Sequence, residues 1–217
     1  MHPLCFLSLV ALCTVRPGAM DMGASNSSLP SPSDAGLRPG QGSFLYFAYG
    51  SNLLRERILL RNPSATFYST GRLQDFKLAF GNRRGRENGR WHGGSATILQ
   101  SPGDEVWGVV WKMNIKNLSS LDKQEGVMSG VYIPIEITVH NEAGEELTCR
   151  CYQLNDYVFS LPSPQYKQVI CMGAKQNLLP ADYQKKLEAI ETNNYEGPMP
   201  IMQEIEAAMK NVQQTMS

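Results

Sequence analysis

The pattern of apolar and polar residues predicts a chain with strands in its centre and helices toward its end. Residues 44–49 form a continuous apolar and aromatic run, which is typical of a strand covered on both faces. The run ends at Gly50, and apolar residues then recur at helical spacing until the pair Asn62-Pro63. This part of the chain is therefore predicted to form a strand, a tight turn and a helix.

Further strands are predicted where β-branched and aromatic residues fall between turn signals, at residues 65–69, 73–80, 95–99, 105–113, 131–139 and 147–154. Residues 81–94 are polar and rich in glycine and arginine, which predicts a surface loop. Amphipathic patterns predict helices at residues 180–190 and 200–212, after a proline-bounded segment at residues 161–174. A strand-rich centre followed by helices favours an α+β fold over a parallel doubly wound sheet.

Residues 1–42 differ in composition from the rest of the chain. Their second half is rich in serine, proline and glycine, which predicts a disordered tail before a domain at residues 43–212. Residues 4–15 are apolar and resemble the core of a secretory signal. No positively charged leader precedes them, and they are shorter than a membrane-spanning helix. Secretion stays an alternative to a cytosolic location.

The balance of charges and the cysteine content indicate which kind of partner and which cellular compartment fit the protein. Twenty basic side chains balance twenty acidic ones, so no overall field would draw the protein to nucleic acid or to an anionic membrane. The five cysteines include no CxxC pair, which favours a reducing compartment, and Cys149 and Cys151 are expected to be free buried thiols. The three histidines are widely separated, so no metal is expected. These features favour a small-molecule partner.

The turn Tyr49-Gly50-Ser51-Asn52 is a candidate binding site. A strand-to-helix turn gathers unpaired backbone N–H groups, and these groups can hold an anion or a developing oxyanion. Gly50 would allow a sharp turn or a close approach to a ligand, and Ser51 or Asn52 would cap the helix. The alternative is that these residues only end a strand and begin a helix. The turn lacks the glycine patterns of nucleotide-binding loops, so a smaller ligand is expected.

Glu125 is the candidate acid/base residue. Within residues 114–126, apolar residues three apart predict a helix that ends at Glu125, with Gly126 just past its end. A carboxylate in the last turn faces the negative end of the helix dipole, which raises its pKa, and burial would raise it further. The alternative is a solvated glutamate at a helix end. Asp122 and Glu105 are interpreted as surface or capping residues.

Five stretches of the sequence resemble the gamma-glutamylcyclotransferase family: FLYFAYGSNLL, WHGGSATI, GDEVWGVVW, SLDKQEGV and SPQYKQVICMGA. Asn52 distinguishes the chain from the glutathione-specific relatives, which carry leucine there. The resemblance implies a closed or nearly closed mixed β-barrel flanked by helices, a homodimer and no cofactor. It also implies that Glu125 is the general base. The substrate-binding residues that it implies are Tyr46, Phe47, Ala48, Tyr49, Gly50, Ser51, Asn52, Tyr132 and Tyr166.

The reaction implied by this resemblance is an intramolecular cyclisation in glutathione metabolism. The α-amine of a γ-glutamyl dipeptide attacks its own γ-carbonyl and releases 5-oxoproline and a free amino acid. Glu125 would take a proton from the amine and return it to the leaving nitrogen. The alternatives are a non-catalytic sensor of an acidic metabolite and a relative that acts on glutathione or on γ-glutamyl amines.

Overall fold

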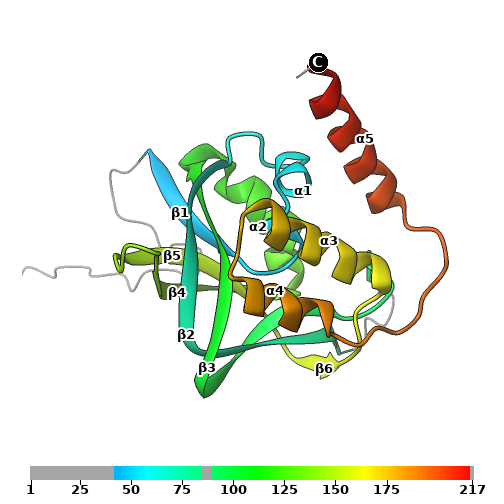
Figure 1. The fold of residues 1–217 in the computed structure, drawn as a ribbon, viewed down its shortest axis with the longest axis horizontal. Coiled ribbons are helices and arrows are strands. Elements are labelled where there is room, and N and C mark those ends of the chain that lie inside the picture. The colour runs from blue at the N-terminus through cyan, green and yellow to red at the C-terminus, as the bar shows by residue number, and fades with distance from the viewer. Residues whose placement is uncertain (1–41, 85–88, 216–217) are drawn as a thin grey trace, which may run out of the picture.

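The computed structural model describes residues 42–84 and 89–215, and its central feature is a closed β-barrel (Figure 1). The strands run in the order β3-β1-β5-β4-β2, and β2 pairs again with β3, which closes the ring. β1 and β5 pair in parallel, and the other neighbours are antiparallel. The strands are β1 (Ser43–Ala48), β2 (Thr66–Arg83), β3 (Ser95–Asn114), β4 (Tyr132–His140), β5 (Glu146–Leu154) and β6 (Tyr157–Phe159). The predicted α+β class and the closed mixed barrel are confirmed.

Strands β2 and β3 are longer than the sequence pattern indicated. Residues 65–69 and 73–80 were expected to form two strands, but both belong to the 18-residue β2. The 20-residue β3 likewise joins residues 95–99 and 105–113. Register shifts between Phe67 and Ser69 and between Gln74 and Phe76 interrupt the pairing without ending it. Polar residues and Gly71 suggested a break, but Thr70, Gly71 and Arg72 pair in regular register with residues 107–109 of β3.

The predicted loop at residues 81–94 is also partly wrong. Residues 81–83 continue β2 and pair with β6, a short strand that the sequence pattern did not indicate. Residues 85–88 of this segment lie outside the described residues.

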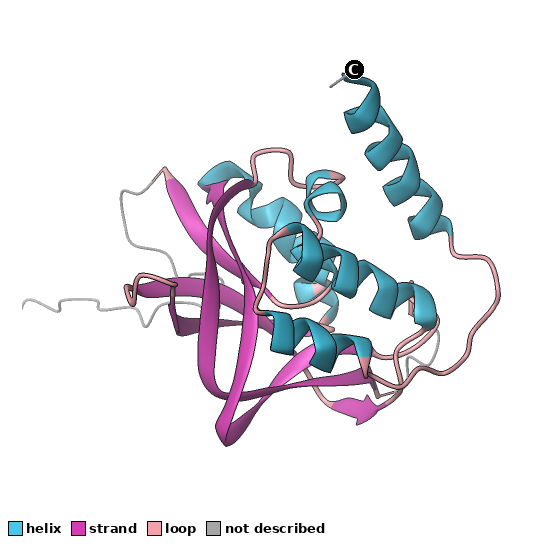
Figure 2. Cartoon of the chain, viewed as in Figure 1, coloured by secondary structure: helices cyan, strands magenta, loops and turns pink. Residues whose placement is uncertain are grey.

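The helices gather on one side of the barrel (Figure 2). The predicted helices near the end of the chain are confirmed as α4 and α5, and α3 is an additional helix in the proline-bounded segment. Ser163 caps α3 by accepting a hydrogen bond from the Tyr166 amide, and Pro164 occupies its first turn. The bounds are α1 (Arg55–Leu59), α2 (Leu118–Glu125), α3 (Pro164–Gln176), α4 (Ala181–Glu188) and α5 (Pro200–Thr215).

Helix α3 holds the turn that follows β1 against the barrel. A Cβ atom at Gly173 would lie 2.5 Å from the Leu54 amide nitrogen, so only glycine permits this close approach. The Asn177 side chain donates a hydrogen bond to the Leu53 carbonyl at 2.8 Å. From the barrel, the Trp111 indole donates to the Asn52 carbonyl at 2.9 Å. The turn is therefore fixed from two sides.

The predicted tail, residues 1–42, lies outside the described residues except for Gly42, and so does the apolar run at residues 4–15. Within residues 42–84 and 89–215, no helix combines the length and the apolar character needed to span a membrane.

Candidate active site

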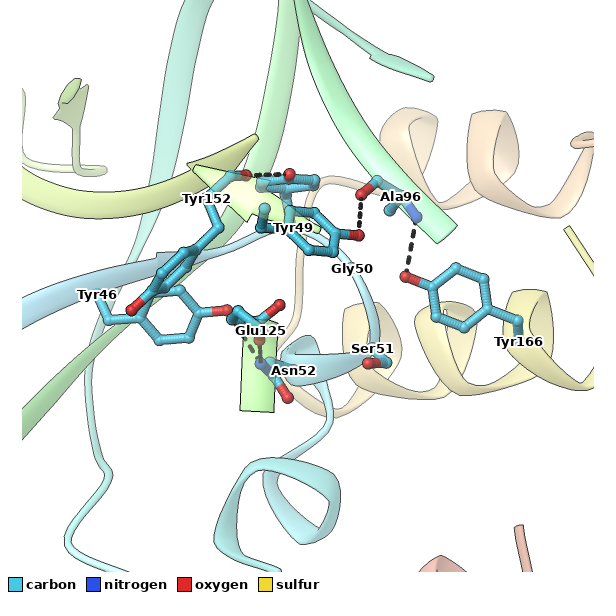
Figure 3. Close-up of a pocket in the computed structure, with 10 residues that line it drawn as sticks. Tyr46, Tyr49, Gly50, Ser51, Asn52, Ala96, Glu125, Tyr152 and Tyr166 are labelled. Atoms are coloured by element: carbon cyan, nitrogen blue, oxygen red, sulfur yellow. Dashed lines mark hydrogen bonds between the residues drawn. The ribbon is translucent and has the colours of Figure 1, made fainter. Parts of the chain in front are cut away.

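A cavity opens where β1 ends, and it has an inner and an outer part. The inner part has a volume of about 40 Å³. The outer part has a volume of about 340 Å³ and shares Ser51, Glu125, Tyr132 and Tyr166 with the inner part. The inner part is lined by Tyr46, Tyr49, Gly50, Ser51, Asn52, Ala96, Glu125, Tyr132, Tyr152 and Tyr166 (Figure 3). The fold therefore brings the predicted turn and Glu125 together in one pocket.

The turn between β1 and α1 leaves backbone donors at this pocket. The first hydrogen bonds of the 3-10 turn run from the amide of Leu53 to the carbonyl of Gly50 (3.0 Å) and from Leu54 to Ser51 (3.2 Å). The amides of Gly50, Ser51 and Asn52 precede these bonds, so the turn does not use them for its own structure. The three residues line the inner cavity, and the Ser51 backbone forms a hydrogen bond with Tyr166 there. A turn with amides of this kind is able to bind an anion.

The predicted capping role of Ser51 or Asn52 is wrong. The residue that caps the 3-10 turn is Gly50, and neither that turn nor α1 has a side-chain capping hydrogen bond. The Asn52 amide group instead donates to the Tyr46 hydroxyl and to Glu125 Oε1, both at 3.0 Å. Its oxygen accepts from the Gln124 side chain at 3.0 Å. Asn52 thus joins the turn to the end of α2.

Glu125 lies at the end of α2, as predicted. Gly126 follows in the left-handed conformation with a φ of 68°, which ends the helix. Glu125 Oε1 accepts hydrogen bonds from Asn52 (3.0 Å) and Gln124 (3.3 Å), whereas Oε2 accepts none from the described residues. The second oxygen is therefore available to a ligand in the cavity.

Burial raises the pKa of Glu125 above the ordinary glutamate value. The positive charge of Arg57 is the strongest opposing influence, followed by the hydrogen bonds from Gln124 and Asn52 and by the more distant Arg90. A carboxylate with a raised pKa binds a proton more readily than a surface glutamate does and can later return it. The electrostatic setting thus suits an acid/base residue.

Tyr132 and Tyr166 meet at the backbone of Ala96. The Tyr132 hydroxyl donates to the Ala96 carbonyl at 2.7 Å, and the Ala96 amide donates to the Tyr166 hydroxyl at 3.0 Å. Burial raises the pKa of Tyr166 to about 12 and raises that of Tyr132 well above its ordinary value. A Cβ atom at Gly50 would lie 3.0 Å from the Tyr166 hydroxyl, so a larger residue there would displace this hydroxyl. Both tyrosines therefore stay protonated at the cavity wall.

The structure places two of the predicted substrate-binding residues elsewhere. Phe47 is fully buried and Ala48 is 1% exposed, and neither lines the cavity. Successive side chains of a strand point to opposite faces, and both faces of β1 are covered. Phe47 and Ala48 therefore both pack in the core. The substrate-binding role given to them by the resemblance lacks support from the cavity geometry.

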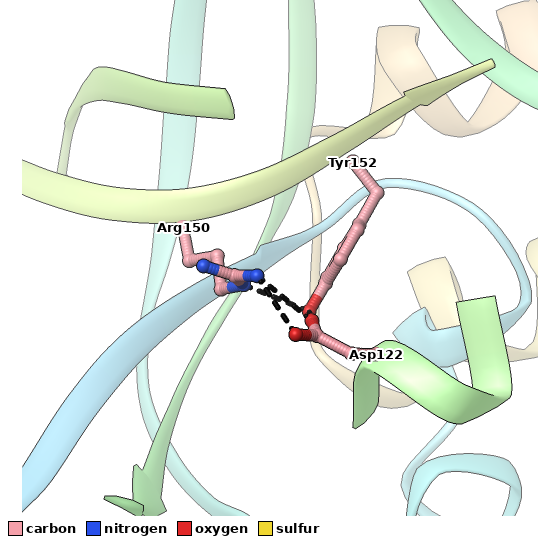
Figure 4. Close-up of polar contacts among 3 residues, drawn as sticks. All are labelled: Asp122, Arg150 and Tyr152. Carbon is pink, nitrogen blue, oxygen red and sulfur yellow. Dashed lines mark hydrogen bonds and ion pairs between the residues drawn. The ribbon is translucent and has the colours of Figure 1, made fainter. Parts of the chain in front are cut away.

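The interpretation of Asp122 as a surface or capping residue is wrong. Its carboxylate forms an ion pair with the fully buried Arg150 of β5, whose Nη2 donates to both carboxylate oxygens at 2.8 and 3.1 Å (Figure 4). Tyr152 donates its hydroxyl to the same carboxylate and accepts a hydrogen bond from Arg150 Nε at 2.9 Å. Asp122 lies one turn before Glu125, so this network anchors α2 to the barrel.

The described residues offer no metal site and no reactive thiol pair at the cavity. The described residues contain no group of three or more histidine, cysteine, aspartate or glutamate side chains arranged for a metal ion. Cys149 and Cys151 are free and buried, as predicted. Burial raises the pKa of the Cys149 thiol to about 12, so this thiol stays protonated and unreactive near neutral pH.

Several pocket residues were missed by the sequence analysis. Tyr152 and Ala96 line the inner cavity, and Arg57 and Arg90 line the outer part. Arg57 left a signal in the sequence, because it lies four residues after Leu53 and next to Ile58, on the helix face that the apolar spacing marks as buried. The other three reach the pocket through strand register and tertiary packing.

Comparisons with known proteins place the chain among characterised relatives. A model described as the AIG2-like family matches residues 105–187. The gamma-glutamylcyclotransferase of Bos taurus is 67% identical over 175 residues, which are 80% of this chain and 92% of that protein. The Homo sapiens protein of the same name is 62% identical over 172 residues, or 79% and 90% of the two chains. A solved structure named gamma-glutamyl cyclotransferase, 62% identical, matches with a TM-score of 0.73 and covers 76% of this chain and 99% of its own.

Proposed function

The chain belongs to the gamma-glutamylcyclotransferase family and is an enzyme, and on this premise we propose that its pocket converts γ-glutamyl dipeptides into 5-oxoproline and a free amino acid. The observation that carries the proposal is the contact between Glu125 and Asn52 at 3.0 Å, which joins the candidate base to the turn whose first amides are not used in its own hydrogen bonds. The pocket thus combines a base and an anion site, as this cyclisation requires.

Binding of the glutamyl unit is proposed to occur in the inner part of the cavity. The amides of Gly50, Ser51 and Asn52 would hold its α-carboxylate or the oxyanion that forms at the γ-carbonyl. The hydroxyl groups of Tyr132 and Tyr166 lie on the same wall. Because nucleophile and electrophile belong to one molecule, folding the glutamyl chain into an attacking geometry supplies much of the rate enhancement.

Proton transfer is proposed to pass through Glu125. The substrate α-amine arrives as an ammonium group and gives one proton to the carboxylate. Its nitrogen then forms a bond to the γ-carbonyl carbon, and the ring nitrogen loses a second proton as the bond to the leaving nitrogen breaks. The leaving nitrogen gains both protons and departs as the ammonium group of an amino acid. Water and a covalent enzyme intermediate are not required.

Finer features stay predictions. The cytosolic location, the role in glutathione metabolism and the homodimer rest on the sequence resemblance and on composition. The proposed role of Glu125 as base, and of the turn, Tyr132 and Tyr166 as substrate-binding groups, is supported by their shared cavity.

Product analysis in water labelled with ¹⁸O tests the proposed reaction. With γ-glutamyl-L-alanine as substrate, we expect equal amounts of 5-oxoproline and alanine, no glutamate and no label in either product, because the attacking group is the substrate amine. Mass spectrometry of the products would show this. Glutamate carrying ¹⁸O would identify a hydrolase instead, and faster turnover of glutathione in direct competition would contradict the proposed substrate class.

A further inference from the structure

Arg57 is a buried cation without a partner in the described part of the chain. Its residue is 3% exposed, and its Nε and Nη1 atoms are buried and have no hydrogen-bond partner. No carboxylate among the described residues forms an ion pair with it. A buried charge of this kind is unfavourable for folding unless an anion joins it. The arrangement indicates a ligand that is absent from the free protein.

Arg150, the other buried arginine among the described residues, and the charged neighbours of Arg57 have partners, so the state of Arg57 is not general to the charged groups of the fold. Arg150 is equally buried but forms an ion pair with Asp122, donating from Nη2 to both carboxylate oxygens. Next to Arg57 in the sequence, Glu56 accepts a hydrogen bond from the Gln176 side chain at 2.8 Å. Arg61, one turn further along the chain, pairs with Glu204 at 3.1 Å.

Arg57 lines the outer part of the cavity, which it shares with Glu125. Burial lowers the pKa of Arg57 from its ordinary value, and the charge of Glu125 acts in the opposite direction. Arginine stays protonated in proteins, so a cation faces this space. Arg83, Arg90 and Lys123 also line the outer part, where Glu125 is the lining acid. The outer part therefore favours an anionic group.

We infer that Arg57 binds the carboxylate of the leaving amino acid, an inference that rests on the proposed function. A γ-glutamyl dipeptide carries two carboxylates on opposite sides of the bond that breaks. If the turn amides hold the glutamyl end in the inner part, the second carboxylate extends into the outer part. A guanidinium group can hold it with two parallel charge-assisted hydrogen bonds.

This contact makes Arg57 a specificity-determining residue. A γ-glutamyl amine has no second carboxylate, so its binding would leave the buried guanidinium group unpaired. A site built to bind a polar group discriminates strongly against an analogue that lacks this group, because the buried polar side chain then stays unpaired. The enzyme should therefore prefer γ-glutamyl amino acids to γ-glutamyl amines of the same size.

Two substrates that differ only in this carboxylate test the inference: γ-glutamyl-L-alanine and γ-glutamylethylamine. For Arg57→Met we expect kcat/KM for the alanine substrate to fall about 30- to 100-fold, in line with the loss of a charged hydrogen-bonding group. The value for the ethylamine substrate should change less than about threefold when wild type and variant are compared on the plateau above the Glu125 pKa, because Arg57 also lowers that pKa. Arg57→Lys keeps the positive charge but loses the planar guanidinium group that can donate to both carboxylate oxygens. It should show an intermediate loss of kcat/KM for the alanine substrate alone.

Controls separate this inference from a folding defect and from failure of the proposed function. Arg55→Met removes an exposed arginine from the same helix and should change neither value. The melting temperature of Arg57→Met should not fall, because the substitution removes an unpaired buried charge. Equal losses on both substrates, or no loss on either, would overturn the inference. A wild-type protein that forms 5-oxoproline from neither substrate would instead overturn the proposed function.

Discussion

Glu125→Gln is expected to lower kcat for 5-oxoproline formation by about 10²- to 10⁴-fold, the usual contribution of a positioned general base. Glutamine has nearly the same shape, and its oxygen can keep the hydrogen bond from Asn52 at 3.0 Å. The variant loses only the capacity to take up a proton. Substrate binding should persist, and single-turnover measurements together with calorimetric titration of γ-glutamyl-L-alanine would show both effects.

Glu105→Gln is the matched control for this substitution. Glu105 lies on β3, outside both parts of the cavity, and its side chain is 37% exposed in an ion pair with Arg72. Its replacement should leave kcat within about twofold, because it neither touches substrate nor shares a network with Glu125. If Glu125→Gln kept more than about a tenth of the wild-type kcat, a general base of ordinary strength would have to lie elsewhere.

Asp122→Asn is expected to lower the free energy of unfolding by about 3 kcal/mol, near the lower end of the range for breaking a buried ion pair. The substitution removes the negative charge that faces Arg150, whose side chain is fully buried. The Asp122 side chain is 16% exposed, so water relieves part of the effect. Urea denaturation followed by circular dichroism would measure the change.

A surface pair and a double replacement serve as controls. Asp182 pairs with Lys185 at 3.1 Å, but the side chains are 91% and 75% exposed, so Asp182→Asn should change stability by less than about 0.5 kcal/mol. Replacing both members of the buried pair, Asp122→Leu with Arg150→Met, should recover much of the loss, since no charge is then left unpaired. An Asp122→Asn effect as small as that of Asp182→Asn would show that the ion pair does not anchor α2.

The sequence pattern predicted those features that depend on local chemistry. The apolar run of β1, the turn at Gly50 and the helix end at Gly126 each have a local cause, namely two-sided burial, backbone freedom and a left-handed cap. The resemblance then connected the turn with Glu125. The structure confirms that they lie together, at 3.0 Å through Asn52.

Other features depend on tertiary packing and were missed or misplaced. Bulges carry β2 and β3 through residues that usually end a strand. Instead of the expected capping role, Asn52 forms hydrogen bonds with Tyr46, six residues earlier, and with Glu125, 73 residues later. Asp122 was taken for a surface residue because its partner, Arg150, lies 28 residues further along the chain. Long-range partners of polar groups leave no signal in a single sequence.

The dependence of kcat/KM on pH tests the central claim most directly, because it reports the pKa of the base in the free enzyme. Glu125 must be ionised to accept a proton, so the rate should fall as the pH decreases through its pKa. Burial raises that pKa, and the midpoint of the acidic limb should therefore lie above the ordinary glutamate value of about 4.3. The limb should disappear from the residual activity of Glu125→Gln. A midpoint at or below the ordinary value, or a limb that persists in this variant, would contradict the assignment of Glu125 as the base.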